Sequence, residues 1–331
     1  MHNASSSACL TVVGGGAWGT VLALLLARNG HDVTLWTRRP EHALAIDRLR
    51  ENSERLPGIR LPESIQTTSD LAGCARNAQA AFIAVPSLGL AEVMSGLAEV
   101  PALVSCSKGL AGPYLTRLSE LISHKQPEAT VAVLSGPNLA KEIASGLPAA
   151  AVAASTDATM AERVQNWLQS STFRIYSSPD PIGVEVGGAL KNVIALAAGM
   201  SDGLGLGDNA KASIVTRGLA EIVRLGLELG ARRETLYGLA GLGDMVATCA
   251  SRNSRNHMAG ERIARGETLE ELRRVGLTAE GIPTVEAVHA FAEERRLSLP
   301  IVSEVYRVAF EQKDPRRAIG DLMARASRSE W

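Results

Sequence analysis

The chain has 331 residues, with 34 Lys and Arg against 35 Asp and Glu and a formal net charge of −1. Its 46% hydrophobic and 21% charged residues are typical of a soluble globular protein, and its length suggests two domains. The balanced charge excludes a strongly basic nucleic-acid binder and an acidic disordered chain, and the 4% aromatic content argues against a platform that stacks single-stranded bases.

The first half of the chain alternates short apolar and β-branched runs with helical patterns. We predict strands at residues 10–14, 32–37, 80–85, 102–105, 130–134 and 149–154. We predict helices at residues 18–29, 41–51, 88–98, 114–124, 137–145 and 157–169. This alternation is typical of a parallel sheet covered on both faces, so we expect a doubly wound α/β domain.

The second half shows no convincing strand beyond Ser178 and is dominated by helical patterns. These patterns predict helices at residues 181–200, 210–229, 244–265, 284–295, 300–312 and 315–325. Two prolines and two serines between Tyr176 and Ile182 interrupt any regular pattern. We therefore expect a nucleotide-binding α/β domain at residues 1–179 and an all-helical substrate and catalytic domain at residues 180–331.

A glycine-rich turn follows the first predicted strand and opens the first predicted helix. Residues 14–19 read GGGAWG and satisfy the pattern G-x-G-x-x-G, with Gly14 for the tight turn, Gly16 for close approach to a pyrophosphate and Gly19 for helix packing. The first-turn amides of such a helix face an anion. A dinucleotide site is the favoured interpretation, and a plain glycine turn is the alternative.

The end of the second predicted strand carries Arg38 and Arg39, where an NAD-specific site usually has an acidic residue. Two guanidinium groups suit the 2′-phosphate of NADPH, and a carboxylate would repel it. We therefore favour NADPH over NADH, although two solvated surface arginines are the alternative.

Two further loops follow predicted strands and fall on the rim where such sheets bind ligands. One contains Lys108, which is suited to contact an anion or the region beside a nicotinamide. The other reads SGPN at residues 135–138 and could offer backbone N–H groups to a substrate. Either loop could also be only a turn.

Lys191 lies in a predicted helix of small and apolar residues. Gly187, Gly188 and Ala195 share its helix face and leave space for a ligand. Desolvation lowers the pKa of a lysine, so such an amine can exchange a proton near neutral pH. The alternative is a lysine that extends to solvent.

Polar residues after this helix suggest the remainder of a site. Asp244 could either belong to it or cap a helix, and Thr248 lies one turn later on the same face. Arg255 between Ser254 and Asn256 offers a donor set for one phosphate, although a polar helix cap would look the same. Glu280 could contact a ribose or lie in a simple turn.

The sequence shows no sign of a metal site, a disulfide framework or a membrane anchor. Its four cysteines lack C-x-x-C spacing and are expected to be reduced thiols, and its six histidines form no ligand pattern. The N-terminus lacks the positive region of a signal peptide, and no stretch approaches the ~20 apolar residues that span a bilayer. We expect a cytoplasmic protein.

Together these stretches resemble the bacterial NAD(P)-dependent glycerol-3-phosphate dehydrogenase family over essentially the whole chain. The resemblance rests on the order and spacing of GGGAWGT, AVPS, SKGL, SGPNLAKEIASGLP, GGALKNVIALAAGMSDG, TRGLAEI, AGLGDMVATCASRNSRN and AEG. It implies a Rossmann domain followed by an all-helical domain of the 6-phosphogluconate-dehydrogenase-like type, with the active site between them. It also implies interconversion of dihydroxyacetone phosphate and sn-glycerol 3-phosphate for phospholipid synthesis.

The resemblance assigns roles residue by residue. It makes Lys191 the proton donor and acceptor, and it implies substrate contacts at Lys108, Gly136, Asn138, Asp244, Ser254, Arg255 and Asn256. It implies nucleotide contacts at Ala17, Trp18, Arg38, Lys108, Ala140, Arg255 and Glu280, with Thr278 less regular than in relatives. Asn138 stands where Thr or Ser is common.

The expected reaction moves a hydride between the nicotinamide and C2 of the triose phosphate. Lys191 would supply the proton, Lys108 would polarise the carbonyl region, and Asp244 would either bind a substrate hydroxyl or orient Lys191. NADPH is the expected cofactor with NADH possible, no metal is needed, and a homodimer is plausible. The alternatives are a β-hydroxyacid dehydrogenase of the 6-phosphogluconate or hydroxyisobutyrate type and a catalytically silent NADP(H) sensor.

Overall fold

The computed structural model describes residues 7–112 and 115–326, which fall into two compact units. The first unit comprises residues 1–108 and 116–185, and the second comprises residues 109–115 and 186–331. The chain passes from the first unit to the second within helix α8 (Pro181–Gly203).

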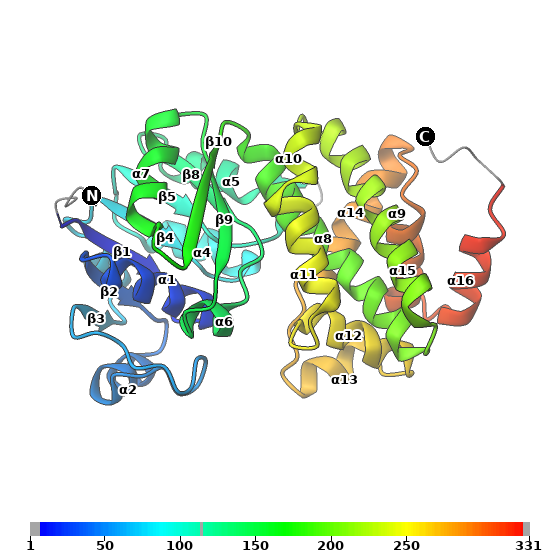
Figure 1. The fold of residues 1–331 in the computed structure, drawn as a ribbon, viewed down its shortest axis with the longest axis horizontal. Helices are drawn as coiled ribbons and strands as arrows, with labels where there is room; N and C mark the ends of the chain where they lie inside the picture. The colour runs from blue at the N-terminus through cyan, green and yellow to red at the C-terminus, as the bar shows by residue number, and fades with distance from the viewer. Residues whose placement is uncertain (1–6, 113–114, 327–331) are drawn as a thin grey trace. The chain divides into compact units, whose positions relative to one another are not determined.

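The first unit is built on an eight-stranded sheet in the order β10-β9-β8-β5-β4-β1-β2-β3 (Figure 1). The strands are β1 (Cys9–Val13), β2 (Asp32–Trp36), β3 (Ile65–Thr68), β4 (Ala80–Ile83), β5 (Ala102–Ser105), β8 (Thr130–Ser135), β9 (Ala149–Ala154) and β10 (Phe173–Ser178). Successive residues of β1 from Leu10 to Val13 are all buried, as expected of a strand covered on both faces. The α/β fold class expected from the sequence is confirmed.

The order of the strands reverses at β1, which pairs in parallel with β2 on one side and with β4 on the other. Right-handed crossovers on the two sides of such a reversal place their helices on opposite faces and leave a crevice at the carboxyl ends of the strands. The glycine turn follows β1 directly and therefore lies at the position where this fold binds ligands.

The strand–helix alternation predicts a parallel sheet, but one pair of strands in the observed sheet is antiparallel. Strand β9 pairs antiparallel with β8 and parallel with β10. The connection between β8 and β9 contains only the five-residue helix α6 (Ala140–Ala144). Residues 136–148 are long enough for a parallel crossover, but the chain instead turns back and pairs antiparallel with β8.

Helices and two short strands complete the chain between these strands. They are α1 (Ala17–Arg28), α2 (Pro40–Leu49), α3 (Leu71–Cys74), η1 (Ser87–Gly89), α4 (Leu90–Gly96), β6 (Leu110–Ala111), β7 (Thr116–Arg117), α5 (Leu118–Lys125) and α7 (Ala158–Leu168). Helix α1 buries nine consecutive residues from Gly19 to Ala27 against the sheet core. It ends before Gly30, whose φ of +88° suits a helix terminus.

The described part of the second unit is helical apart from β6. Besides α8 it contains α9 (Gly207–Glu228), α10 (Arg233–Tyr237), the π-helix η2 (Leu239–Gly243), α11 (Asp244–Ala250), α12 (Arg255–Ala264), α13 (Leu269–Arg274), α14 (Gly281–Arg295), α15 (Pro300–Phe310) and α16 (Pro315–Met323). The helical character expected for this half is therefore present, in more and shorter pieces than the sequence indicated.

Helix α8 corrects the expectation that no stretch approaches the length of a membrane span. Among the described residues it alone is long and apolar enough, with 23 residues and a mean hydropathy of 1.3 over its best window. Within that window 94% of the residues are buried inside the protein. It is therefore built as the core helix of a folded domain.

Several elements differ from those expected. Strands β3 and β10 were not predicted, because polar residues fill much of IQTT and FRIYSS. The helix expected at residues 244–265 is two helices, since the chain leaves the helical conformation after Ala250 and Ser254 caps α12. The short elements α10, η2 and α13 were also missed.

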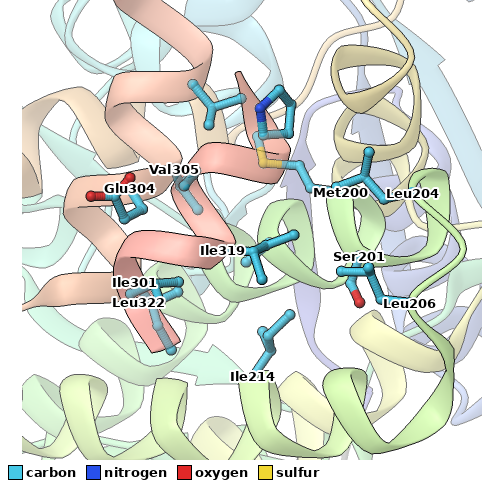
Figure 2. Close-up of a pocket in the computed structure, with 14 residues that line it drawn as sticks. Met200, Ser201, Leu204, Leu206, Ile214, Ile301, Glu304, Val305, Ile319 and Leu322 are labelled. Carbon is cyan, nitrogen blue, oxygen red and sulfur yellow. The ribbon is translucent and has the colours of Figure 1, made fainter. Parts of the chain in front are cut away.

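The second unit contains an apolar pocket lined by α8, α9, α15 and α16, with Met200, Ile214, Val305 and Ile319 around it (Figure 2). Its one ionisable lining residue, Glu304, is paired with Arg307 and Lys313. None of the candidate site residues lines this pocket.

Candidate cofactor and catalytic sites

The glycine turn of the first unit is shaped by close backbone contacts. Gly14 has a φ of +132°, and a Cβ there would lie 2.4 Å from the Ala84 carbonyl oxygen. A Cβ on Gly19 would lie 1.9 Å from the Gly14 carbonyl oxygen. Both positions therefore require glycine, as the motif indicated.

The turn fits the diphosphate of a dinucleotide. Within residues 7–112 and 115–326 no side chain caps the N-terminus of α1, so its first-turn N–H groups are available to an anion. A Cβ on Gly16 would meet no described atom within 4 Å. The buried indole nitrogen of Trp18 has no hydrogen-bond partner among the described residues. Ala17 is the first residue of α1.

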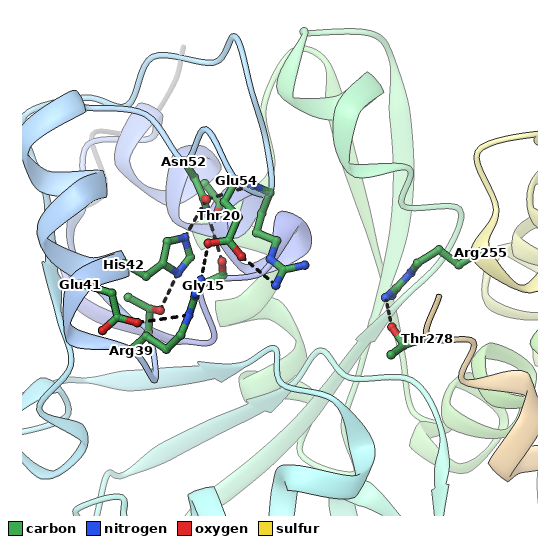
Figure 3. Close-up of polar contacts among 11 residues, drawn as sticks. Gly15, Thr20, Arg39, Glu41, His42, Asn52, Glu54, Arg255 and Thr278 are labelled. Atoms are coloured by element: carbon green, nitrogen blue, oxygen red, sulfur yellow. Dashed lines mark hydrogen bonds and ion pairs between the residues drawn. The ribbon is translucent and has the colours of Figure 1, made fainter. Parts of the chain in front are cut away.

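Arg38 and Arg39 lie just after β2, and both form ion pairs. Arg38 Nη2 lies 3.3 Å from Glu92 Oε1, with both side chains more than 70% exposed. Arg39 pairs with Glu54 and lies 3.8 Å from Glu41 (Figure 3). Exposed ion pairs contribute little to stability, so a 2′-phosphate could replace these carboxylates as the partner of either guanidinium.

Lys108 and the loop at residues 135–138 are brought together. Lys108 Nζ donates to the Gly136 carbonyl oxygen at 2.9 Å. Gly136 has a φ of +147°, and a Cβ there would lie 2.9 Å from Ala151 Cα. The amide oxygen and nitrogen of Asn138 are buried without a partner among the described residues, which suits a ligand contact, and Ala140 begins α6.

Lys191 lies in the middle of α8 and is buried with its amine held by α11. Its Nζ donates to Asp244 Oδ1 at 2.5 Å and to Thr248 Oγ1 at 2.7 Å. Thr248 in turn donates to the Asp244 carbonyl oxygen at 2.6 Å. The alternative that Lys191 extends to solvent is wrong, because its side chain is only 9% exposed.

Two local expectations about this helix are corrected. Asp244 is not the N-cap of α11: Gly243 holds that position, and the Asp244 side chain is buried against Lys191. The small residue Gly187 does not leave room for a ligand. A Cβ there would lie 2.9 Å from the Ala240 carbonyl oxygen, because the backbone of η2 packs against it.

Ser254 and Asn256 are both buried and both make internal hydrogen bonds. The Ser254 hydroxyl accepts from the His257 N–H and caps α12. Asn256 Nδ2 donates to Asn192 Oδ1 at 2.9 Å, and its Oδ1 accepts from the Gly281 N–H at 2.8 Å. These bonds fix the start of α12 against α8 and α14.

Arg255 differs from its two neighbours because its side chain is exposed. Its Nη1 donates to Thr278 Oγ1 at 2.9 Å (Figure 3). Glu280 holds the N-cap position of α14, and its carbonyl oxygen accepts from Thr284 Oγ1 at 2.7 Å. Thr278, the less regular position, therefore lies beside the arginine expected to bind phosphate.

Sequence reasoning gave no role to two residues of these clusters. Thr248 lies four residues after Asp244, so the two side chains share one face of α11. This spacing was the signal that could have assigned Thr248 to the site. Asn192 had no signal of its own, because its contact with Asn256 joins residues 64 positions apart.

One of the four cysteines, Cys249, lies near Lys191. All four cysteines are free, and burial raises the pKa of the Cys249 thiol to about 12 although Lys191 lies near it. A thiol of this kind stays neutral and is a poor nucleophile. No group of three or more His, Cys, Asp or Glu side chains in the described parts of the chain could hold a metal ion.

Comparison with known proteins accounts for both units. Residues 9–161 match the N-terminus, and residues 180–320 the C-terminus, of NAD-dependent glycerol-3-phosphate dehydrogenase. The NAD(P)+ glycerol-3-phosphate dehydrogenase of Deinococcus radiodurans is 48% identical over 326 residues, covering 98% of each chain. That of Thermus thermophilus is 47% identical over 322 residues, covering 97% of this chain and 99% of the relative.

Solved structures agree with these relatives. The crystal structure of glycerol-3-phosphate dehydrogenase from Coxiella burnetii is 36% identical, with a TM-score of 0.91 over 96% of this chain and 99% of that one. The Plasmodium falciparum glycerol-3-phosphate dehydrogenase structure is 26% identical, with a TM-score of 0.88 over 98% and 97%. The chain therefore belongs to the NAD-dependent glycerol-3-phosphate dehydrogenase family.

Proposed function

We propose that the protein reduces dihydroxyacetone phosphate to sn-glycerol 3-phosphate with NAD(P)H, supplying the backbone of glycerophospholipids. One observation carries the proposal: the buried Lys191 amine is held at a fixed place by Asp244 and Thr248. The names of the relatives from Deinococcus radiodurans and Thermus thermophilus support the same reaction.

When bound, NAD(P)H supplies a hydride from C4 of its nicotinamide to C2 of the ketone. The carbonyl oxygen then needs a proton, and Lys191 Nζ donates it in reduction and takes it back in oxidation. Burial disfavours the ammonium form of Lys191, whereas the Asp244 carboxylate at 2.5 Å favours it.

Asp244 acts through Lys191 in this proposal. Its Oδ1 accepts from Lys191 Nζ, and the Thr248 hydroxyl gives the amine a second oxygen partner. These two oxygens fix the position of the Lys191 amine on α8 relative to α11. Of the two roles open for Asp244, orientation of Lys191 is the one that this geometry supports.

The phosphate of the substrate is assigned to Arg255. Its guanidinium is exposed and can form paired, charge-assisted hydrogen bonds with a phosphate. Ser254 and Asn256 are engaged in internal bonds, so we propose that they shape the N-terminus of α12 around Arg255. Lys108 and Asn138 would contact the substrate from the loops that follow β5 and β8, beside Gly136.

The cofactor is NADPH in preference to NADH in this proposal, although either would use the glycine turn. Arg38 and Arg39 would hold the 2′-phosphate, and Gly14, Gly16, Ala17, Trp18 and Gly19 would hold the diphosphate region. We assign Ala140, Thr278 and Glu280 to the remaining nucleotide contacts, with Lys108 and Arg255. The reaction takes place in the cytoplasm, and the enzyme is a homodimer in this proposal.

The test is NADPH oxidation with dihydroxyacetone phosphate, followed by nicotinamide absorbance, in the wild type and in Lys191→Ala. The variant should lose about 10²–10⁴-fold in kcat while NADPH still binds, as for loss of a positioned general acid. Lys125→Ala, an exposed lysine on α5, is the matched control and should keep wild-type turnover. Near-normal turnover by Lys191→Ala would remove the proposed role.

The same assay separates the competing activities. Turnover of 6-phosphogluconate or hydroxyisobutyrate, with none on dihydroxyacetone phosphate, would replace the proposal with a β-hydroxyacid dehydrogenase. Tight NADPH binding with no turnover of any of these substrates would point to an NADP(H) sensor.

A further inference from the structure

Four buried polar side chains lie against the glycine turn, and neither the motif nor the proposed reaction accounts for them. They are Thr20 on α1, Thr37 after β2, His42 on α2 and Asn52 in the loop after α2, and we call them the Asn52 network (Figure 3). Each is less than 9% exposed, and Asn52 is 1% exposed. Buried polar groups in folded proteins are nearly always hydrogen-bonded, and each of these four side chains has a partner.

The direction of every bond follows from the amide of Asn52. Its Nδ2 donates to the Gly15 carbonyl oxygen at 3.0 Å and to Thr20 Oγ1 at 2.8 Å. Because a carbonyl can only accept and the Arg55 N–H can only donate, the nitrogen must face Gly15 and Oδ1 must face Arg55 at 3.2 Å.

The orientation of the Asn52 amide also sets the tautomer of neutral His42. Asn52 Oδ1 also lies 3.0 Å from His42 Nε2, so that nitrogen carries the proton. In the neutral imidazole, His42 Nδ1 then accepts from the Thr37 hydroxyl at 2.9 Å. Thr20 accepts from Asn52 and donates to the Gly16 carbonyl oxygen at 2.8 Å. The network thus runs in one direction, from Thr37 to the turn.

These bonds decide which way the peptides of the turn face. In a planar trans peptide the carbonyl and the following N–H point in opposite directions. With the Gly15 carbonyl held by Asn52 and the Gly16 carbonyl held by Thr20, the N–H groups of Gly16 and Ala17 point away from the network. A carbonyl turned the other way would repel a phosphate.

The network also joins the turn to the end of β2. His42 holds the hydroxyl of Thr37, the residue before Arg38. Gly15 packs directly on Thr37, since a Cβ on Gly15 would lie 2.7 Å from Thr37 Cβ. The segment that faces the diphosphate and the segment that carries the arginines are therefore braced by one set of bonds.

We propose that Asn52 is a positioning residue for dinucleotide binding, which presents the amides of the glycine turn to the diphosphate. The inference rests on the proposed use of this turn by NAD(P)H. It predicts a role in binding either dinucleotide, because NADH and NADPH share the diphosphate, and no role in proton transfer.

The test is Asn52→Asp, which keeps the shape of the side chain and removes both donor bonds. The Kd of NADPH and that of NADH, measured by nicotinamide fluorescence, should rise by the same factor of about tenfold or more, as expected for two lost hydrogen bonds. The kcat at saturating NADPH and dihydroxyacetone phosphate should stay within about twofold of wild type, because the proton donor is untouched.

Asn29→Asp is the matched control. Asn29 Nδ2 also donates to two carbonyl oxygens, of Trp167 at 2.8 Å and Gln169 at 3.1 Å, but at the opposite end of α1. It should bind both dinucleotides as the wild type does. If Asn52→Asp does not fold, Thr20→Val removes the hydroxyl between Asn52 and Gly16 and should weaken both dinucleotides, and Thr20→Ser should restore binding.

Wild-type Kd values in the folded Asn52→Asp variant would overturn the inference. An equal loss of affinity in Asn29→Asp would also overturn it, since that would show a general effect on the first unit. A wild-type protein that binds neither dinucleotide would instead overturn the proposed function.

Discussion

The adjacent residues Ser254, Arg255 and Asn256 differ in exposure and in their hydrogen-bond partners. The Arg255 guanidinium is exposed, whereas Ser254 caps α12 and Asn256 bonds internally. Arg255→Ala should raise the KM for dihydroxyacetone phosphate by about 10–100-fold, the cost of losing a charge-assisted hydrogen bond, as measured by initial rates at saturating NADPH. Arg252→Ala, an exposed arginine three residues earlier, is the control. An unchanged KM would place the phosphate elsewhere.

The proposed preference for NADPH over NADH also depends on a single residue, Arg38. Its present partner, Glu92, is exposed and weakly held. Arg38→Asp puts a carboxylate where NADPH would carry its 2′-phosphate, so the ratio of kcat/KM for NADPH to that for NADH should fall by about tenfold or more. Arg48→Asp on the exposed face of α2 controls for the charge change. A ratio that does not move would contradict the assignment.

At the scale of elements, α8 and α12 cross with their backbones in close approach. A Cβ on Gly260 of α12 would lie 2.1 Å from the Leu196 carbonyl oxygen of α8. Gly260→Ala should therefore lower the free energy of unfolding by about 1–3 kcal/mol in urea denaturation. Gly320→Ala on α16 meets no described atom within 4 Å and should raise it by about 0.5–1 kcal/mol. If both substitutions change the free energy of unfolding in the same direction, the packing argument is refuted.

At the scale of the whole molecule, a buried carboxylate links stability to pH. Glu221 on α9 accepts from the N–H groups of Ile301 and Val302 at the start of α15, at 2.7 Å and 3.1 Å. Burial raises the pKa of Glu221 from 4.5 to about 7. The folded protein thus holds a proton that the unfolded chain releases between these values, and stability falls as pH rises from about 4.5 to 7.

The raised pKa of Glu221 lowers the free energy of unfolding by about 3 kcal/mol between pH 4.5 and pH 7. This decrease should disappear from the pH dependence of urea denaturation in Glu221→Gln, which cannot ionise. Glu228→Gln, at an exposed position later in the same helix, should keep the wild-type slope. If the free energy of unfolding of Glu221→Gln still falls with pH as in the wild type, other groups cause the pH dependence.

The sequence by itself determined the elements whose signals are local. The glycine turn at residues 14–19, the strand–helix alternation and the apolar α8 follow from backbone sterics, periodicity and chain direction. Lys191 could be singled out because a charged residue in an apolar helix is costly wherever that helix packs.

Only the tertiary structure decided which distant groups meet. The partners of Lys191 are 53 and 57 residues away, and Asn52 reaches the Gly15 carbonyl across 37 residues. The antiparallel β9, the break before α12 and the capping of α15 by Glu221 likewise depend on chain segments far apart in sequence. Hydrogen bonds and close packing act over a few ångströms of space, and a local pattern carries no record of which residues the fold brings within that range.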